Sequence, residues 1–341
     1  MRALTAPQLT EDALIASLRD ALGRPPRALR VGIGDDAAVW KTPGSHLTVL
    51  TTDMLVDGVH FRSHATSPED LGVKSLAVNL SDIAAMGARP AVAVIALGIT
   101  EEVDADWLRR LYRGMASLAN SSQCAIAGGD VVRAPVLTIG VTIAGHVRPS
   151  RLRVRSGAKP GDVIAVTGSL GRAAAGLRVL DRQLADALES GDRATVCDAY
   201  LRPTPRLREG AFLGGSTAVH AMMDISDGLS TDVGRMAFAS GVDAVVDIRL
   251  LTLDPAVRAA AKLTGDDALR LTFDGGDDYE LLIAIRRRSF TQVARGLHGR
   301  CGTALRAIGA FEKGSGAVWS VDDSGRRPLP PRGYDHLSQR A

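Results

Sequence analysis

Aspartates stand beside glycine or serine, at the predicted ends of apolar runs or turns, in six motifs spread along the chain. They are Asp35, Asp36, Asp53, Asp57, Asp82, Asp130, Asp224, Asp227, Asp277 and Asp278. A single aspartate beside glycine is usually a turn residue or a helix cap, but six such motifs are hard to explain by turns alone. Carboxylates gathered at the ends of strands repel one another and need compensating cations. We therefore expect a fold that brings these motifs around divalent metal ions.

The segments between these motifs alternate between apolar runs and stretches with helical spacing of apolar residues. In the first half, strands are predicted at residues 29–36, 47–53, 91–99, 124–127 and 136–147, and helices at residues 9–22, 68–86 and 104–120. In the second half, strands are predicted at residues 163–167, 218–223, 242–248, 279–285 and 304–308, and helices at residues 172–188, 254–262 and 289–297, with another ending at residue 240. Both halves are therefore expected to be α/β or α+β.

An Arg-, Gly- and Pro-rich stretch at residues 148–162 interrupts this alternation. The length of 341 residues allows two domains of about 150 residues each. We therefore predict a first domain over residues 1–148 and a second over residues 149–341, with the fold class α/β plus α+β.

Composition and charge exclude several classes of protein. No apolar run approaches about 18 residues, and the N-terminus lacks the apolar core of a signal peptide, so we expect a cytoplasmic protein without membrane association. Cys124, Cys197 and Cys301 are odd in number and far apart, which argues against a disulfide framework or a structural zinc site. The net charge of +3 comes from scattered arginines, and aromatic residues make up only 4% of the chain. Nucleic acid is therefore not an expected partner, whereas a small anion is possible.

Familiar catalytic motifs are missing as well. The chain has no Gly-Lys dipeptide and hence no P-loop, no HExxH and no GxSxG, and the GIGDDA segment at residues 32–37 places two carboxylates where a dinucleotide would bind. Oxygen ligands select hard cations such as Mg²⁺, which is often shared between carboxylates and substrate phosphates. Glycines beside the aspartates allow backbone N–H groups to approach phosphate oxygens, or else form tight turns. Together these features suggest metal-assisted handling of a nucleotide.

A few other polar residues are open to two interpretations. His60 alone is more typical of a packing or surface residue than of a substrate contact. Lys74 and Asn79 lie on the predicted helix that carries Asp82 and are compatible with an ordinary exposed helix face. Ser226 and Asp227 directly precede a predicted helix, so that they either cap it or mark a helix N-terminus that faces an anion.

The motifs also occur in an order typical of one family. In sequence they read GIGDDAAV, TTDMLVDGVHF, KSLAVNLSDIAAMGARP, AGGD, RSGAKPGD, LRPTPR, DISDGL, GGDDYEL and GYDH. This series resembles the thiamine-monophosphate kinase family, within the aminoimidazole-ribonucleotide-synthetase-like superfamily, nearly from end to end. The resemblance implies a two-domain synthetase-like fold whose N-terminal sheet pairs with that of a second subunit in a homodimer. It also implies the reaction of ATP, as co-substrate, with thiamine monophosphate to give ADP and thiamine diphosphate, assisted by several Mg²⁺ ions.

The resemblance assigns roles to individual residues. The implied metal ligands are Asp36, Thr51, Thr52, Asp53, Asp82, Asp130, Asp224 and Asp227. The implied nucleotide contacts are Gly129, Asp130, Arg155 and Ser226, with Tyr112 as a candidate for stacking on adenine. The implied contacts to thiamine monophosphate are His60, Asp277 and Tyr334. Asp82 and Asp227 are expected to matter most for catalysis. Because the acceptor is already an anionic phosphate oxygen, we predict direct in-line transfer without a strong general base.

Four positions, in three motifs, depart from the family pattern. Asp277 replaces a more frequent glutamate, Val131 and Val132 replace two hydroxyl residues after Asp130, and Asp57 replaces a glutamate.

Rival interpretations of the function are another ATP-using enzyme of the superfamily and a nucleotide-binding protein without catalysis. Selenophosphate synthetases need a reactive Cys or selenocysteine in an N-terminal loop and the hydrogenase-maturation protein a cysteine-bearing tail, whereas this sequence has no cysteine before Cys124 and none near its end.

Overall fold

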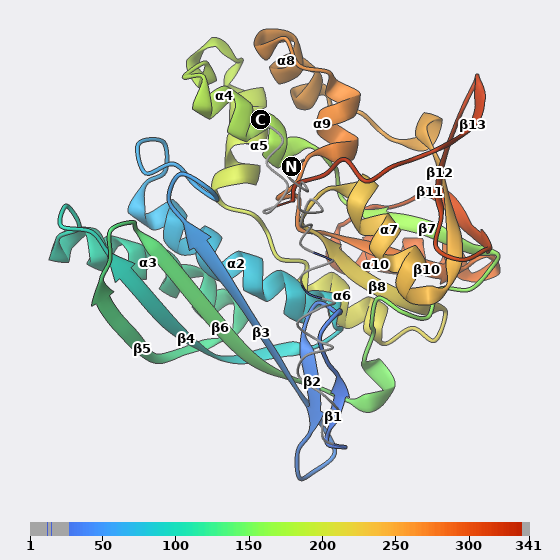
Figure 1. The fold of residues 1–341 in the computed structure, drawn as a ribbon, viewed down its shortest axis with the longest axis horizontal. Coiled ribbons are helices and arrows are strands. Elements are labelled where there is room, and N and C mark those ends of the chain that lie inside the picture. Colours follow the sequence, from blue (N-terminus) through green and yellow to red (C-terminus); the bar gives the residue numbers. More distant parts are fainter. Residues whose placement is uncertain (1–11, 13–14, 16–26, 336–341) are drawn as a thin grey trace, which may run out of the picture.

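The computed structural model describes residues 12, 15 and 27–335 and shows two mixed α/β halves, each built on a β-sheet (Figure 1). The helix predicted at residues 9–22 lies mostly outside the described residues. Within the part of the chain that is described, no helix is long and apolar enough to cross a membrane.

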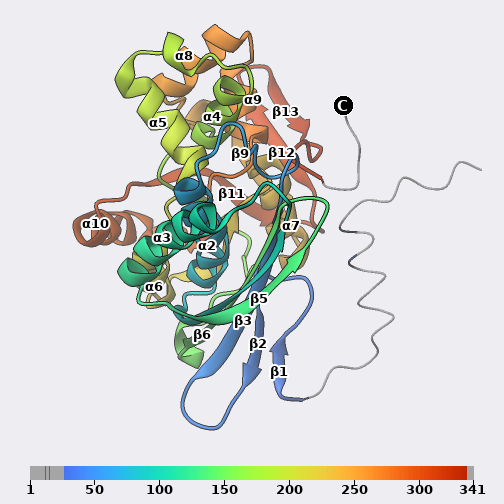
Figure 2. The same cartoon turned by 90° about the vertical axis from the view of Figure 1, so that its left-hand side faces the viewer.

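The first sheet has six strands in the order β1-β2-β3-β6-β4-β5. The strands are β1 (Leu29–Val31), β2 (Ala38–Lys41), β3 (Leu47–Val56), β4 (Arg89–Ile99), β5 (Ala125–Arg133) and β6 (Thr138–Val147). Helices α2 (Pro68–Ala85) and α3 (Ala105–Ser122) cover one face of this sheet (Figure 2). On the other face Met54 is 60% exposed, Val94 45% and Val132 53%, so that this open face carries apolar side chains.

Helix α2 begins at a clear N-terminal signal. The Ser67 hydroxyl accepts a hydrogen bond from the backbone N–H of Asp70, and Pro68 occupies the first turn, where its missing N–H is not needed. The helix packs against the first sheet, α3, α5, α6 and β8. Since α2 is surrounded in this way, Lys74 (1% exposed) and Asn79 (0%) are buried. The interpretation of these two residues as an exposed helix face is therefore wrong.

The second sheet has seven strands in the order β13-β12-β9-β11-β7-β10-β8. The strands are β7 (Asp162–Thr167), β8 (Val219–Ile225), β9 (Val242–Asp247), β10 (Glu280–Arg286), β11 (Leu305–Lys313), β12 (Val318–Asp322) and β13 (Gly325–Pro328). The helices of this half are α4 (Arg172–Asp181), α5 (Ser190–Leu201), α6 (Leu207–Gly214), α7 (Leu229–Ser240), α8 (Pro255–Thr264), α9 (Ala268–Asp274) and α10 (Phe290–Cys301). Buried aliphatic side chains of β7, β8 and β10 contribute to cores on both faces of the sheet.

Three predicted elements differ from the structure. The strand predicted at residues 29–36 ends at Val31, and strand β2, which follows it, was not predicted. The single helix predicted at residues 172–188 ends at Asp181, because Gln183 adopts a positive φ of 56° and turns the chain toward α5. The strand predicted at residues 124–127 continues as β5 through the Gly-Gly-Asp segment, which therefore belongs to an edge strand and not to a loop. Strands β12 and β13 and helices α5, α6 and α9 were not predicted.

Candidate active site

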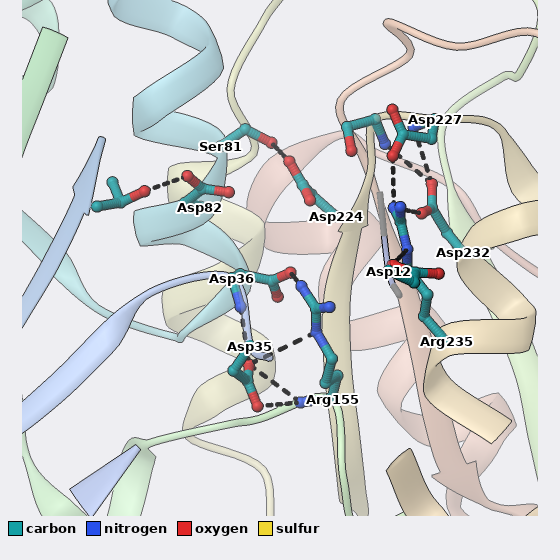
Figure 3. Close-up of polar contacts among 12 residues, drawn as sticks. Asp12, Asp35, Asp36, Ser81, Asp82, Arg155, Asp224, Asp227, Asp232 and Arg235 are labelled. Carbon is teal, nitrogen blue, oxygen red and sulfur yellow. Dashed lines mark hydrogen bonds and ion pairs between the residues drawn. The ribbon is translucent and has the colours of Figure 1, made fainter. Parts of the chain in front are cut away.

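Three of the predicted metal ligands meet where the two halves of the chain come together (Figure 3). Asp36 precedes β2, Asp82 lies in the last turns of α2, and Asp224 lies near the end of β8. One carboxylate oxygen of each residue lies within 4.8 Å of those of the other two. We call these three residues the acid cluster. Segments that are far apart in sequence thus converge on one point, as the aspartate motifs predict.

Each carboxylate of the acid cluster is held by a neighbouring donor. The Thr51 hydroxyl donates to Asp82, and the Ser81 hydroxyl donates to Asp224 at 2.6 Å (Figure 3). The Arg155 guanidinium donates to Oδ1 of Asp36 at 2.5 Å, whereas the buried Oδ2 of Asp36 has no hydrogen-bond partner among the described residues. These contacts leave lone pairs of several oxygens directed at a common space.

The carboxylates of the acid cluster are shielded from water and repel one another, so that their negative charge is unfavourable without a cation. Burial, together with the charges of the neighbouring aspartates, raises the pKa of both Asp82 and Asp224 well above the ordinary value for aspartate. Burial and the charge of Asp227 raise the pKa of Asp53 to about 6. A bound cation would reverse these shifts because it favours the charged carboxylates. The partly buried, oxygen-only donor set with an unpartnered carboxylate oxygen therefore fits a hard divalent cation such as Mg²⁺.

A second acidic group surrounds the turn between β8 and α7. Asp232 accepts hydrogen bonds from the backbone N–H groups of Ser226 and Asp227, both at 3.1 Å, and is fully buried. Arg235 pairs with Asp227 at 2.5 Å and with Asp232 at 3.0 Å (Figure 3). Burial and the charge of Asp227 raise the pKa of Asp232 to about 7. Asp232 and Arg235 were not predicted, although an aspartate in the first turn of the helix after DISDGL was a signal for a capping role.

Two of the predicted metal ligands lie elsewhere. Thr52 follows Thr51 on β3, so its side chain points to the open face of the first sheet, where it donates to the carbonyl of Val141 and contacts Thr142. Asp130 lies on edge strand β5, opposite Ala96 of β4, and is exposed on the same open face. Three strand spacings separate β3 from β5 in the sheet, about 14 Å. Thr52 and Asp130 of this chain therefore do not join the acid cluster.

The predicted nucleotide contacts are distributed over several regions. Gly129 lies directly against β4, where a Cβ atom would come within 1.7 Å of the carbonyl oxygen of Ile95. Arg155 lies at the acid cluster, and its backbone N–H also donates to Asp35. Burial and the charge of Asp36 raise the pKa of Asp35 to about 7. Tyr112 packs against the core of the first half, near the N-terminal turns of α2 and away from Asp82.

The predicted contacts to thiamine monophosphate lie around the loop before β10. The Asp277 carboxylate accepts hydrogen bonds from the Lys74 ammonium and from the Tyr279 hydroxyl, both at 2.9 Å. The carbonyl of His60 accepts a hydrogen bond at 3.2 Å from the hydroxyl of Tyr200, whose ring lies beneath the Lys74 ammonium.

Tyr334, the third predicted contact to thiamine monophosphate, and Asp278, which follows Asp277 in sequence, contact other parts of the fold. The backbone N–H of Tyr334 donates to the carbonyl of Asp227 at 3.0 Å, next to the second acidic group. Both carboxylate oxygens of Asp278 accept from the backbone N–H of Gly171 at 2.9 Å, at the start of α4. Asp277 and Asp278 therefore serve different parts of the fold.

The amino-acid sequence of the chain matches known protein families and individual relatives over most of its length. Residues 34–147 match the family model for the N-terminal domain of AIR synthase related protein, and residues 159–319 match the model for its C-terminal domain. The chain is 38% identical to the thiamine-monophosphate kinase of Salmonella typhimurium and 36% identical to that of Escherichia coli K12. Each alignment covers 96% of this chain and 98% of the relative.

Solved structures show the same similarity. A structure described as AaThiL complexed with AMPPCP and TMP superimposes with a TM-score of 0.84 and 28% identity, over 98% of this chain and all of that chain. The thiamine-monophosphate kinase from Stenotrophomonas maltophilia K279a gives a TM-score of 0.75 and 38% identity, over 92% of this chain and 96% of that one.

Proposed function

The chain belongs to the thiamine-monophosphate kinase family, and from this we propose that it transfers the γ-phosphoryl group of ATP to thiamine monophosphate. The products would be ADP and thiamine diphosphate. The observation that carries the proposal is the acid cluster, because three carboxylates from distant segments, that of Asp224 buried and the other two partly buried, form a site for the divalent cation that ATP brings. The named relatives align over almost their whole length, which supports the choice of substrate.

We propose that Mg²⁺ is held by the acid cluster and by Asp53 and Asp227. Bound there, Mg²⁺ would neutralise charge on the transferring phosphoryl group. The protein residues then have two tasks. As metal ligands, Asp82 and Asp227 would fix the positions of the bound phosphates through Mg²⁺, and Thr51 and Ser81 keep the carboxylates of Asp82 and Asp224 oriented.

The acceptor needs little activation by the protein. The acceptor oxygen of thiamine monophosphate belongs to a phosphate that is already anionic near neutral pH, so the reaction needs no strong general base. We therefore propose direct in-line transfer, with catalysis by positioning and by electrostatic stabilisation. His60, Asp277 and Tyr334 are the proposed contacts to thiamine monophosphate, and Arg155, Ser226 and Tyr112 are proposed contacts to ATP.

We also propose a homodimer in which the open faces of two first sheets pair. The exposed side chains of Met54, Val94 and Val132 support this pairing, since a free sheet face would leave them in water. Thr52 and Asp130 lie on the same face, so the pairing would bring the metal ligands predicted there, and Gly129 beside them, to the interface between subunits. Because ATP is a cytoplasmic metabolite, we propose the cytoplasm as the site of the reaction.

The test is to measure thiamine diphosphate formed from thiamine monophosphate, ATP and Mg²⁺. Parallel reactions contain EDTA, or free thiamine in place of the monophosphate. We expect product only with the monophosphate and free Mg²⁺. ATP binding without transfer would contradict the proposal and favour another substrate or a role without catalysis.

A further inference from the structure

A lysine is buried between the two halves of the chain, beside the proposed substrate contacts. Lys74 lies on α2, two turns before Asp82, and is 1% exposed. Its ammonium lies 2.9 Å from the carboxylate of Asp277 and 3.5 Å from the centre of the Tyr200 ring. Burial of an ammonium group is costly unless it is paired, so these two contacts are what make the position tenable. Burial lowers the pKa of Lys74, and the Asp277 carboxylate opposes that effect.

Asp277 is held in an unusual backbone conformation. Its φ is +66°, and that of Tyr279 is +48°, a region that residues with side chains rarely adopt. The backbone N–H of Asp277 donates to the carbonyl of Ser226 at 2.7 Å, and that of Tyr279 donates to the carbonyl of Ile225 at 2.8 Å. Such strain persists where the surroundings determine the conformation strongly, and it is common at ligand sites.

The carboxylate of Asp277 keeps room for a further partner. Lys74 donates to Oδ2 and the Tyr279 hydroxyl donates to Oδ1, so each oxygen has one protein donor and a remaining lone pair. The side chain of Asp277 is 33% exposed, whereas Lys74 beneath it is buried. The two donors thus approach from the protein side, and the exposed side of the carboxylate is left for a ligand.

We propose that Lys74 and Tyr279 are positioning residues that orient the Asp277 carboxylate toward the organic part of thiamine monophosphate, which is a cation with an amino group. This inference rests on the proposed function. Neither residue needs to touch the substrate, and both act through Asp277. They therefore govern binding of the acceptor, while the acid cluster governs the transfer of the phosphoryl group.

A purely structural role makes a different prediction. A buried lysine that only supports packing would affect folding and all kinetic constants together, whether or not Asp277 is intact. A positioning residue affects the KM for thiamine monophosphate and depends on the Asp277 carboxylate. A double-mutant cycle separates the two roles, because residues that act as a unit are not additive.

The experiment measures steady-state kinetics of the full chain for Lys74→Met, Asp277→Asn and the double variant. Activity of the unmodified protein with thiamine monophosphate establishes the proposed function first, so that its failure is distinguishable from failure of this inference. We expect Lys74→Met to raise the KM for thiamine monophosphate about tenfold, with kcat and the KM for ATP within about twofold of the starting values. The double variant should be no worse than Asp277→Asn alone.

Two further variants complete the test. Arg110→Met removes another basic residue paired with an acidic side chain of α2, Glu69, and should leave the KM unchanged. Tyr279→Phe removes only the hydroxyl donor and should raise the KM about threefold, an effect that disappears in the Asp277→Asn background. This variant decides the question if Lys74→Met does not fold. An unchanged KM, additive effects in the double variants, or a loss confined to kcat would overturn the proposal.

Discussion

Helix α2 contributes Asp82 to the acid cluster and Lys74 to the Lys74–Asp277 pair, and these two groups balance their charges in opposite ways. In the described part of the chain, Asp82 and Asp224 accept hydrogen bonds from neutral hydroxyls, and Arg155 is the cation paired with Asp36. Asp277, in contrast, has an ammonium of its own within 2.9 Å. The acid cluster therefore has a deficit of positive charge that a metal ion can fill, whereas the Asp277 carboxylate is already paired and serves to orient a ligand.

The strongest test of this contrast is the removal of one carboxylate from the acid cluster. We expect Asp82→Asn to lower kcat by a factor of about one hundred or more, because electrostatic stabilisation of the transferring group is the largest contribution at such sites. The fold should remain intact, as judged by circular dichroism. Asp106→Asn, which changes a side chain 66% exposed on α3, is the matched control. Near-normal turnover of Asp82→Asn would refute the metal assignment.

The next test removes the basic partner of the cluster. Arg155→Gln should lower the free energy of unfolding by about 3 kcal/mol in EDTA, because it leaves Asp35 and Asp36 without their guanidinium partner. Added Mg²⁺ should restore part of this loss, since the metal ion supplies the missing positive charge. Chemical denaturation with and without Mg²⁺ measures both values. An equal loss in the two conditions would show that Arg155 and the metal ion do not balance the same carboxylates.

The pH dependence of stability gives a third, smaller effect. The pKa of Asp53 is raised from 3.8 to about 6 and that of Asp35 from 3.8 to about 7, mainly by burial. Between pH 3.8 and about 7 the folded state therefore binds more protons than the unfolded state, so stability falls as pH rises. We expect the Tm in EDTA to be several degrees lower at pH 7.5 than at pH 5, with a smaller difference in Mg²⁺. A Tm that rises from pH 5 to pH 7.5 in EDTA would contradict the raised pKa values of Asp53 and Asp35 in the folded protein.

The smallest effect is expected for an ion pair on the surface. Glu69 and Arg110 join α2 to α3 at 2.8 Å, but both are partly exposed. Solvent screens such pairs. Glu69→Gln should change the Tm by no more than about 2 °C and should not alter its response to Mg²⁺. If Glu69→Gln lowered the Tm as much as Arg155→Gln does, the exposed Glu69–Arg110 pair would stabilise the fold as strongly as the buried pairs of Arg155, and the expected effect of solvent exposure would be refuted.

The sequence predicted most of the strands and the meeting of the acid cluster, because aspartates at the ends of apolar runs carry a local signal. It did not predict the burial of Lys74, since helical spacing around α2 does not reveal that the second half of the chain covers its remaining side. It also did not separate Thr51 from Thr52. Their side chains point to opposite faces of β3, and only the packing of α2 on one face shows which of them meets Asp82.

Helix α2 carries Asp82 to the acid cluster and Lys74 to the loop of Asp277. The two positions are eight residues apart, which is about 12 Å along the helix axis. A single inserted or deleted residue between them would rotate one side chain by about 100° relative to the other and break one of the two contacts. During evolution the length of the stretch between Lys74 and Asp82 is therefore constrained independently of its residues, and insertions are expected in loops outside helix α2.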